Sequence, residues 1–390
     1  MSNTAILRGI AWNHSRALPP LVATAQRFEE LHPDAKILWE KRSLHDFGHA
    51  DVVSLASRYD LLVIDHPMMG IARESHALLE LQKFFPRLFL DDLSSDSVGQ
   101  SYESYCCQDS VLALPIDAAA PAASYRPDLL DRAGYDTPRT WDGVIELARK
   151  GLVVAPGFHV DVFMNFMGMY VSVGGRISED SEECFERETA RQCLDLLRDL
   201  GAHLPEEVYQ WNPISVYERM AASDRHAYCP FAYTYSNYSR AAFAKRLILF
   251  TNPVSLGNGQ PLRTVLGGTG IAISSHCAAI ETAVDYIKEV AGADWQRTLY
   301  GLSGGQPARR SAWRDETLNQ IAHGFFKQTL DSMEHAYLRP RYAGYIEFQE
   351  QAGVPMVNYL RGGGSTASVV EDINALYRQS RRADVTGRFK

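Results

Sequence analysis

Residues 111–150 have the sequence VLALPIDAAAPAASYRPDLLDRAGYDTPRTWDGVIELARK. The apolar start predicts a short buried strand that ends at Pro115, because proline cannot donate a hydrogen bond to a sheet. After a run of small residues, a helix is predicted to begin at Pro127 and end at Gly134. Thr140 is placed to cap a second helix over residues 141–150. This order of elements indicates a passage of the chain from one domain into another.

The same stretch resembles family 1 extracellular solute-binding proteins, the sugar receptors of ABC importers. The likeness lies in the order of its landmarks: the LP step, the YRPDLLDRAG helix, the following proline and the TWDGVIELARK helix. Later segments resemble the same family: LGGTGIAIS at 266–274, ETAVDYIKEVAGADWQ with SGGQPARRSAW within 281–313, and HAYLRPRYAGYIEFQE at 335–350. The resemblance therefore extends over nearly the whole chain.

This resemblance implies an α/β protein with the type II periplasmic-binding-protein-like fold, in which a ligand cleft separates two lobes. One lobe would comprise residues 1–117 and 265–320, and the other residues 118–264 and 321–390. The implied function is that of a solute-binding protein, which closes its lobes over a carbohydrate or sugar acid for ABC-type uptake. Its partners would be that small molecule and an ABC permease.

The composition is that of a soluble globular protein. The 390 residues are enough for two cores, and 46% hydrophobic with 22% charged residues argue against disorder. The net charge of −8 and the lack of a long Lys/Arg run argue against nucleic-acid binding. No apolar run is long enough to span a membrane.

The start of the chain and its cysteines bear on location. Residues 1–4 show neither the basic nor the apolar region of a signal peptide. The six cysteines lack zinc-site spacing, so buried free thiols are expected, with no metal site and no cofactor. The sequence as written predicts a cytoplasmic protein, or a periplasmic one if an upstream signal was removed.

The first 65 residues predict the frame of one lobe. Apolar strands over 5–12, 36–40 and 60–65, with a helix over 18–31 after the first, predict a parallel sheet covered on both faces. Ligands collect at the carboxyl ends of such strands. The side chains expected at that edge are Trp12, Asn13, His14, Arg42, Ser43, Asp65 and His66.

Later segments predict further elements. Strands are expected over 227–233, 247–250 and 270–273, and a Met-rich core helix over 161–175. The tail predicts helices over 318–337, 343–361 and 369–378, with Pro355 kinking or interrupting the middle one.

The strand-end residues suit the recognition of a sugar. Asp65 can accept hydrogen bonds from hydroxyl groups, although it can also cap its own loop. Trp12 offers a face for stacking on a sugar ring, with core packing as the alternative. Asn13 and His14 offer directed donors and acceptors, and Ser43 is a weaker candidate.

Candidates also lie beyond the first strands. Tyr233 and Tyr235 belong to a cluster of hydroxyl-bearing rings, YTYSNY, of which about half can face a cleft. Backbone groups at Gly268 and Thr269 can approach a ligand closely. The remaining candidates are Asp117 at the crossing, Trp211 with Asn212, Arg309 as an anion partner, and the pair His159 and Asp161, for which solvent exposure is the default.

An enzyme on the same fold is the alternative function. A cytoplasmic lyase, hydrolase or isomerase would use Asp65, His66 and His14 as acid–base groups on a small polar metabolite. No nucleophile motif and no metal spacing among the histidines supports it, so binding is favoured over catalysis, with ligand sensing a third role. Neither the identity of the ligand nor the oligomeric state follows from the sequence.

Overall fold

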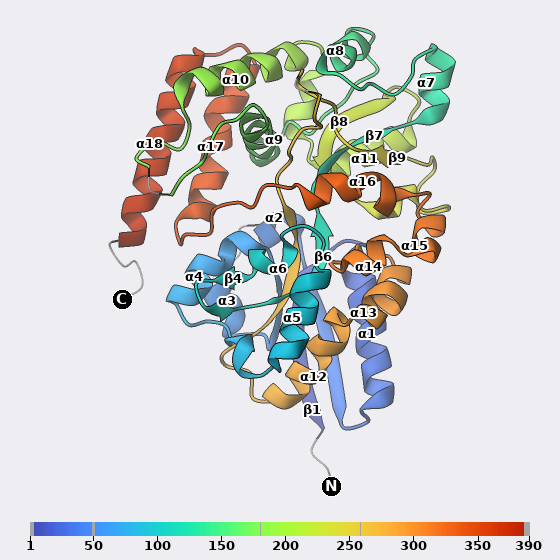
Figure 1. Ribbon diagram of the computed structural model, residues 1–390, viewed down its shortest axis with the longest axis vertical. Helices are drawn as coiled ribbons and strands as arrows, with labels where there is room; N and C mark the ends of the chain where they lie inside the picture. The colour runs from blue at the N-terminus through green and yellow to red at the C-terminus, as the bar shows by residue number, and fades with distance from the viewer. Residues whose placement is uncertain (1–3, 49–50, 180, 258, 386–390) are drawn as a thin grey trace.

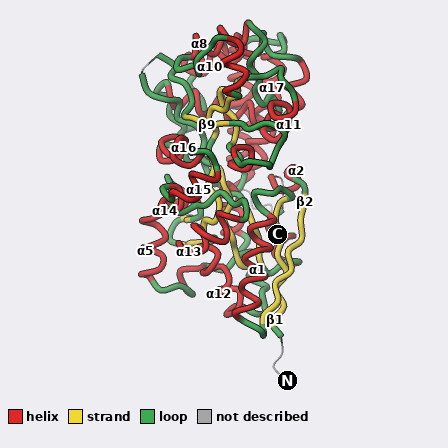
Figure 2. The backbone as a smooth tube through the Cα atoms, turned by 90° about the vertical axis from the view of Figure 1, so that its right-hand side faces the viewer, coloured by secondary structure: helices red, strands yellow, loops and turns green. Residues whose placement is uncertain are grey.

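The structure is a computed structural model of the chain, and it describes residues 4–48, 51–179, 181–257 and 259–385. It consists of two lobes stacked along the long axis (Figure 1). Lobe 1 is built on a five-stranded sheet, and lobe 2 on a three-stranded sheet. The view in Figure 2 shows the same division, with α8, α10 and α17 at one end and α1 and α12 at the other.

The sheet of lobe 1 has the strand order β2-β1-β3-β10-β6. Its strands are β1 (Ala5–Trp12), β2 (Ala35–Arg42), β3 (Leu61–Ile64), β10 (Gly267–Ile273) and β6 (Leu114–Ala119). The first three are parallel, as predicted, but β10 runs antiparallel to both of its neighbours. The sheet is mixed because β10 enters it from lobe 2, at the edge where β1 and β3 end.

Alternating side chains of this sheet pack on two layers of helices, as the period of a strand requires. One face, with Leu7, Ala11 and Val63, packs on α1 (Leu18–Leu31) and α12 (Ile280–Ala291). The other face, with Ile10 and Leu62, packs on α3 (Val52–Ala56) and α4 (Met69–Glu74). The smaller elements of lobe 1 are α2 (Leu44–Gly48), η1 (His66–Met68), η2 (Leu81–Lys83), α5 (Arg87–Asp96), α6 (Ser101–Ser104), β4 (Cys106–Cys107), β5 (Ser110–Val111), α13 (Ala293–Trp295), the π-helical η5 (Gln296–Tyr300), α14 (Arg310–Trp313) and α15 (Glu316–Ile321).

Lobe 2 surrounds an antiparallel sheet of order β8-β7-β9. Its strands are β7 (Pro121–Tyr125), β8 (Tyr228–Tyr233) and β9 (Leu249–Thr251). The Met-rich helix is α9 (His159–Ser172), which is buried over most of its length, as predicted for a core helix. The other helices are α7 (Pro127–Ala133), α8 (Trp141–Arg149), α10 (Arg187–Gly201), η3 (Glu206–Gln210), α11 (Pro213–Ala222), η4 (Ser236–Ser239), α16 (Phe325–Glu334), α17 (Tyr345–Leu360) and α18 (Thr366–Val385).

The lobes are joined where strands of the two sheets follow one another. β6 ends at Ala119 and β7 begins at Pro121, so one residue separates the two sheets. The return crossing precedes β10 and lies beside the segment between α16 and α17. There the Leu266 N–H donates to the Tyr337 carbonyl over 2.8 Å, and the Tyr337 N–H donates to Thr264 over 2.7 Å. Residues from three distant parts of the chain therefore meet at the lobe boundary.

Within residues 111–150 one local prediction is wrong. Pro115 lies inside β6 rather than at its end, because β6 is an edge strand and its pairing with β10 shifts register beside this proline. The helix ends are as predicted. Gly134 takes a left-handed conformation with φ of 76° after α7, and the Thr140 hydroxyl accepts a hydrogen bond from the Gly143 N–H at 3.2 Å.

The tail also differs from the prediction. The helix expected over 318–337 is split into α15 and α16 at Gly324, whose φ is 80°. Pro355 does not interrupt α17, because the buried face of that helix packs closely on α9. At Gly353 a Cβ atom would lie 1.9 Å from the His159 carbonyl oxygen, so only glycine permits this approach. Across the described ranges, no helix combines the length and apolarity needed to cross a bilayer.

Candidate functional site

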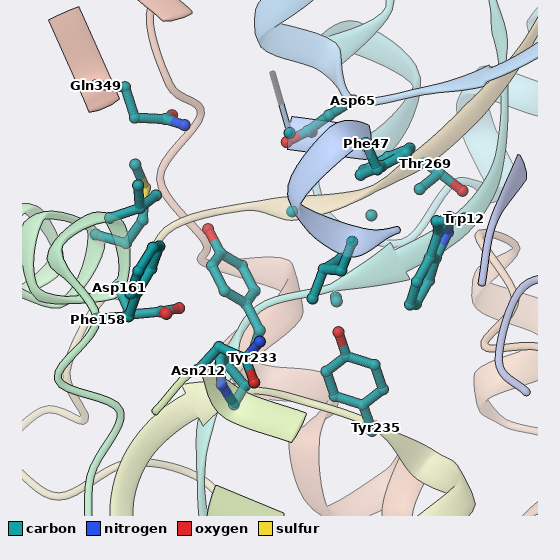
Figure 3. A pocket seen from close by; sticks show the side chains of 18 of the residues that line it. Trp12, Phe47, Asp65, Phe158, Asp161, Asn212, Tyr233, Tyr235, Thr269 and Gln349 are labelled. Atoms are coloured by element: carbon teal, nitrogen blue, oxygen red, sulfur yellow. The ribbon is translucent and has the colours of Figure 1, made fainter. Parts of the chain in front are cut away.

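A cavity of about 290 Å³ lies between the lobes, close to the lower size limit of about 300 Å³ typical of small-molecule sites (Figure 3). Lobe 1 and the crossings contribute residues from strand ends and from α2: Trp12, Arg16, Leu44, Phe47, Gly48, Asp65, Ala119, Gly267, Gly268 and Thr269. Lobe 2 contributes residues from β8 and the turn after it, from η3, from the starts of α9 and α11, and from α17 and the segment before it. They are Phe158, Val160, Asp161, Met164, Gln210, Asn212, Pro213, Tyr233, Tyr235, Arg339, Gln349 and Glu350.

Aromatic rings form much of the wall. The Trp12 ring lies at the end of β1, and its centroid is 6.0 Å from those of Phe47 and Tyr235. Its side chain is packed among these rings and is only 3% exposed, so core packing is observed, while its place in the cavity lining leaves stacking on a sugar ring a prediction. No described group accepts a hydrogen bond from its indole N–H.

Tyr233 and Tyr235 line the cavity together. They are two residues apart in extended chain, so their side chains share one side while Thr234 faces the other. Both hydroxyl groups point from lobe 2 into the space facing lobe 1 (Figure 3). The Tyr233 hydroxyl has no hydrogen-bond partner among the described residues. It is therefore free to bind a ligand hydroxyl.

The carboxylate of Asp65 lines the cavity, but it is held by Arg339 of lobe 2. Arg339 Nη2 donates to Asp65 Oδ1 and Oδ2 over 2.9 and 2.8 Å, and its Nη1 donates to Gln349 Oε1 over 2.8 Å. Burial opposes ionisation of Asp65, but the charge of Arg339 outweighs it and lowers the pKa below its usual value. The predicted sugar acceptor is thus also one half of an ion pair between the lobes.

Asp117 is buried behind the wall and does not line the cavity. The Arg16 Nε–H donates to Asp117 Oδ2 over 2.8 Å, Arg16 Nη2 donates to Oδ1, and Nη1 donates to the Thr234 carbonyl over 2.7 Å. The prediction that Asp117 faces the ligand is therefore replaced by a different role. It orients Arg16, which connects the end of β6 to lobe 2.

The two histidines predicted at the strand ends lie outside the cavity lining. Burial, assisted by the charge of Arg16, lowers the pKa of His14 to about 3, and its ring stacks on Trp12. Burial and the charge of Arg339 lower the pKa of His66 to about 4, although its Nδ1 lies 3.1 Å from Asp65 Oδ1. Both rings are neutral near pH 7 and support the wall from behind.

Other predicted residues are engaged elsewhere, which corrects their placement at the ligand. Asn13 is exposed, and the Ser43 hydroxyl donates to Asp46 over 2.6 Å near the start of α2. Trp211 lies under the guanidinium of Arg219, 3.9 Å from its ring centroid, although its neighbour Asn212 lines the cavity. Arg42 does not line the cavity and donates to the Val63 carbonyl.

Arg309 is buried within lobe 1 and does not line the cavity, which corrects its predicted place at the ligand. Its Nη1 donates to Asp92 Oδ2 over 2.8 Å, and its Nε donates to the Ala291 carbonyl over 2.9 Å. The guanidinium thus ties α5 to the end of α12. The glycine-rich turn before Arg309 therefore has a structural role within lobe 1.

Gly268 and Thr269 line the cavity with β10, where the strand changes register against β6. The φ of Gly268 is 113°, and a Cβ atom there would lie 2.3 Å from the Asp117 carbonyl oxygen. Only glycine allows the strand to approach β6 so closely at this point.

An acidic pair marks the lobe 2 side. Asp161 lies in the first turn of α9, is 9% exposed, and receives no hydrogen bond from the described residues. Burial, followed by the nearby charge of Glu350, raises the pKa of Asp161 to about 8. His159 does not line the cavity and lies behind this pair, with its Nε2 3.5 Å from Glu350 Oε2.

Several lining residues were not found from the sequence. Arg339, Gln349 and Glu350 lie in the HAYLRPRYAGYIEFQE segment, whose pattern indicates the family but no ligand contact. Phe47 lies in the short helix α2 and Phe158 at the N-cap of α9, where no repeating pattern marks a ligand contact. No local signal could have shown that these residues line one cavity, because tertiary contacts alone bring them together.

Comparisons with known proteins agree with this architecture. The sequence model of the family described as bacterial extracellular solute-binding protein matches residues 11–297, about three quarters of the chain. No curated protein sequence matches the chain.

Solved structures share the fold along both whole chains. The maltose-bound MalE3 of T. maritima has a TM-score of 0.81 at 20% identity, covering 96% of this chain and 99% of that one. A solute-binding protein of Agrobacterium radiobacter in complex with ribitol has the same TM-score and identity over 98% and 99%. A protein of Thermotoga lettingae bound with α-D-tagatose reaches 0.82 at 15% identity over 97% and 100%. With the family match and this shared two-lobe fold, the chain belongs to the bacterial extracellular solute-binding protein family.

Proposed function

We propose that this protein is a receptor that encloses one small carbohydrate or polyol between its lobes and presents it to an ABC permease. The observation that carries the proposal is the cavity itself, in which aromatic rings from both lobes alternate with hydroxyl, amide and carboxylate groups. Rings suit the apolar faces of a sugar, and directed polar groups suit its hydroxyls.

The ligands named for similar structures support this class. They include maltose, ribitol, α-D-tagatose and, for a protein of Agrobacterium vitis, D-mannitol. All are neutral and rich in hydroxyl groups. A cavity of about 290 Å³ matches a ligand of this small size better than a long oligosaccharide.

Closure of the lobes is the step that a permease reads. A ligand bound to both walls stabilises the closed arrangement, because it makes contacts there that an open cleft lacks. The ion pair between Asp65 and Arg339 acts in the same direction, since it joins the two lobes at the rim of the ligand space.

Thermal unfolding with a panel of sugars, polyols and sugar acids tests the proposal. A ligand at one hundred times its Kd adds about 2.7 kcal/mol to the free energy of unfolding and raises Tm. Calorimetry then gives stoichiometry, and chromatography of the recovered ligand shows whether it is unchanged. If no compound raises Tm, or if the ligand is chemically converted, the receptor function is wrong.

A role in uptake also predicts where the protein is located in the cell. A receptor that serves an importer meets its ligand outside the cytoplasmic membrane. Cell fractionation of the native protein, followed by immunoblotting, gives its location directly. Recovery from the cytoplasm alone would contradict a role in uptake while leaving ligand binding intact.

A further inference from the structure

The charges of the cavity are unevenly matched. Both arginines that line it are already bound to carboxylates, Arg16 to Asp117 and Arg339 to Asp65. An anionic ligand would therefore meet no free cation among the described lining residues. The carboxylate of Asp161 has no such counter-charge in the same lining.

The position of Asp161 suits ligand binding and does not stabilise the fold. Its side chain is nine-tenths buried and points toward the space beside Tyr233 (Figure 3). Within the described chain no hydrogen bond reaches its carboxylate, and Glu350 places a second carboxylate in the same wall. A buried carboxyl group without a partner costs desolvation energy in the empty protein. A ligand group that pairs with it offsets this cost, which favours binding.

The surroundings of Asp161 also favour a cation. Phe158 and Tyr233 present aromatic rings in the same part of the cavity, and the negative faces of such rings attract ammonium groups. The Tyr233 hydroxyl, which lacks a partner among the described residues, can accept a further hydrogen bond.

We infer that the ligand carries a protonated amine that binds against Asp161, so that the receptor selects amino sugars or amino polyols over their neutral counterparts. This inference rests on the proposed function, because it specifies the ligand class of the same cavity. A hydrogen bond between two charged groups is stronger than one to a neutral hydroxyl, and the difference predicts about tenfold tighter binding of the amine.

Matched ligands test this selectivity by calorimetry. Glucamine and sorbitol differ only by an amine in place of one hydroxyl, and glucosamine is compared with glucose and with N-acetylglucosamine. The amines are expected to bind at least about tenfold tighter than the hydroxyl and acetylated forms. The amine preference should fall to within about threefold in Asp161→Asn, which keeps the shape but not the charge.

Asp131→Asn is the control, because this exposed carboxylate in α7 lies away from the cavity and should leave the preference unchanged. Circular dichroism and Tm of each variant show that it is folded. Equal or tighter binding of the neutral ligands would overturn the amine inference and leave the carbohydrate receptor standing. An amine preference that survives in Asp161→Asn would also overturn it. If none of these compounds binds but another sugar or polyol raises Tm, the amine inference is wrong and the receptor function stands. If no sugar, polyol or sugar acid binds at all, the proposed function itself is wrong.

Discussion

Arg339 of lobe 2 donates hydrogen bonds from one guanidinium nitrogen to both carboxylate oxygens of Asp65 in lobe 1, over 2.9 and 2.8 Å. The arginine is 4% exposed and lies in the segment between α16 and α17, whereas Asp65 directly follows β3. The two lobes are therefore joined by a charged contact that also forms part of the ligand cavity.

Removal of one partner of this pair should destabilise the protein strongly. Arg339→Gln leaves the Asp65 carboxylate partly buried without its counter-charge, and we expect a loss of about 3 kcal/mol in the free energy of unfolding. Urea titration measures the loss. The double variant with Asp65→Asn should recover much of it, because no unpaired charge remains; a double variant as unstable as Arg339→Gln would contradict an ionic origin.

Removal of two different tyrosine hydroxyls should affect ligand binding in one case and stability in the other. Tyr233→Phe removes a hydroxyl without a partner in the described chain, so we expect unchanged stability but a weaker ligand affinity by about tenfold. Tyr217→Phe is the matched control, since its buried hydroxyl donates to the Ala232 carbonyl over 3.1 Å. That control should lose about 1 kcal/mol of stability. Calorimetry and urea unfolding of both variants measure the two effects, and equal behaviour would be evidence against a ligand contact at Tyr233.

Asp161→Asn should stabilise the empty protein in a pH-dependent way. The carboxyl of Asp161 has a pKa of about 8 in the folded chain against 3.8 as the ordinary value. Between these values the folded chain holds a proton that the unfolded chain has lost, so stability falls as pH rises.

Asparagine cannot lose that proton. The stability gain from Asp161→Asn is therefore expected to be small near pH 4, to grow with pH, and to level off above about pH 8. It should reach several kcal/mol, because a difference of one pKa unit corresponds to about 1.4 kcal/mol. Urea unfolding across this range measures it, and a gain independent of pH would show that Asp161 is not buried as an acid.

The same titration should govern the binding of an amine. The titratable groups that interact electrostatically with Asp161 are Glu350 on α17, Tyr233 and Tyr235 from lobe 2, and the Cys229 thiol on β8. His159 lies beside Glu350. The pKa of each of these tyrosine and cysteine groups is raised by burial, so they stay neutral.

An amine as basic as that of lysine, with a pKa of about 10, stays charged while Asp161 ionises. Its affinity should therefore rise from about pH 6 to about pH 9, and binding near pH 7 should release a proton. Calorimetry in buffers of different ionisation enthalpy detects that proton. Affinity that falls over this range would mean that the neutral acid is the form that binds.

Much of the fold could be predicted locally. β1 and α1 have the bounds that their apolar patterns predict, and Gly134 and Thr140 act at helix ends as their chemistry requires. The wrong predictions concern prolines whose tolerance depends on how their strand or helix packs against neighbouring elements. Pro115 fits inside β6 only because that strand is at the edge of its sheet, and Pro355 fits inside α17 only because packing on α9 holds that helix.

The site was less predictable than the fold. Strand-end logic led to Trp12 and Asp65, which line the cavity, and alternation led to Tyr233 and Tyr235. The same logic also led to His66, although the chain turns into η1 after Asp65 and buries that ring. A position at a strand end places the backbone, whereas the turn that follows decides which side chain faces the ligand.

The sequence by itself indicated the family and several strands and helices, some of them with their ends, because periodicity and capping act over a few residues. Only the tertiary structure decided which charges are free. Asp65 and Arg339 are 274 positions apart, and Arg16 and Asp117 are 101 apart. Such ion pairs form between surfaces that meet after folding, so no local pattern records them. Their formation neutralises both arginines of the described cavity lining and leaves Asp161 as a buried carboxyl group of that lining without a counter-charge.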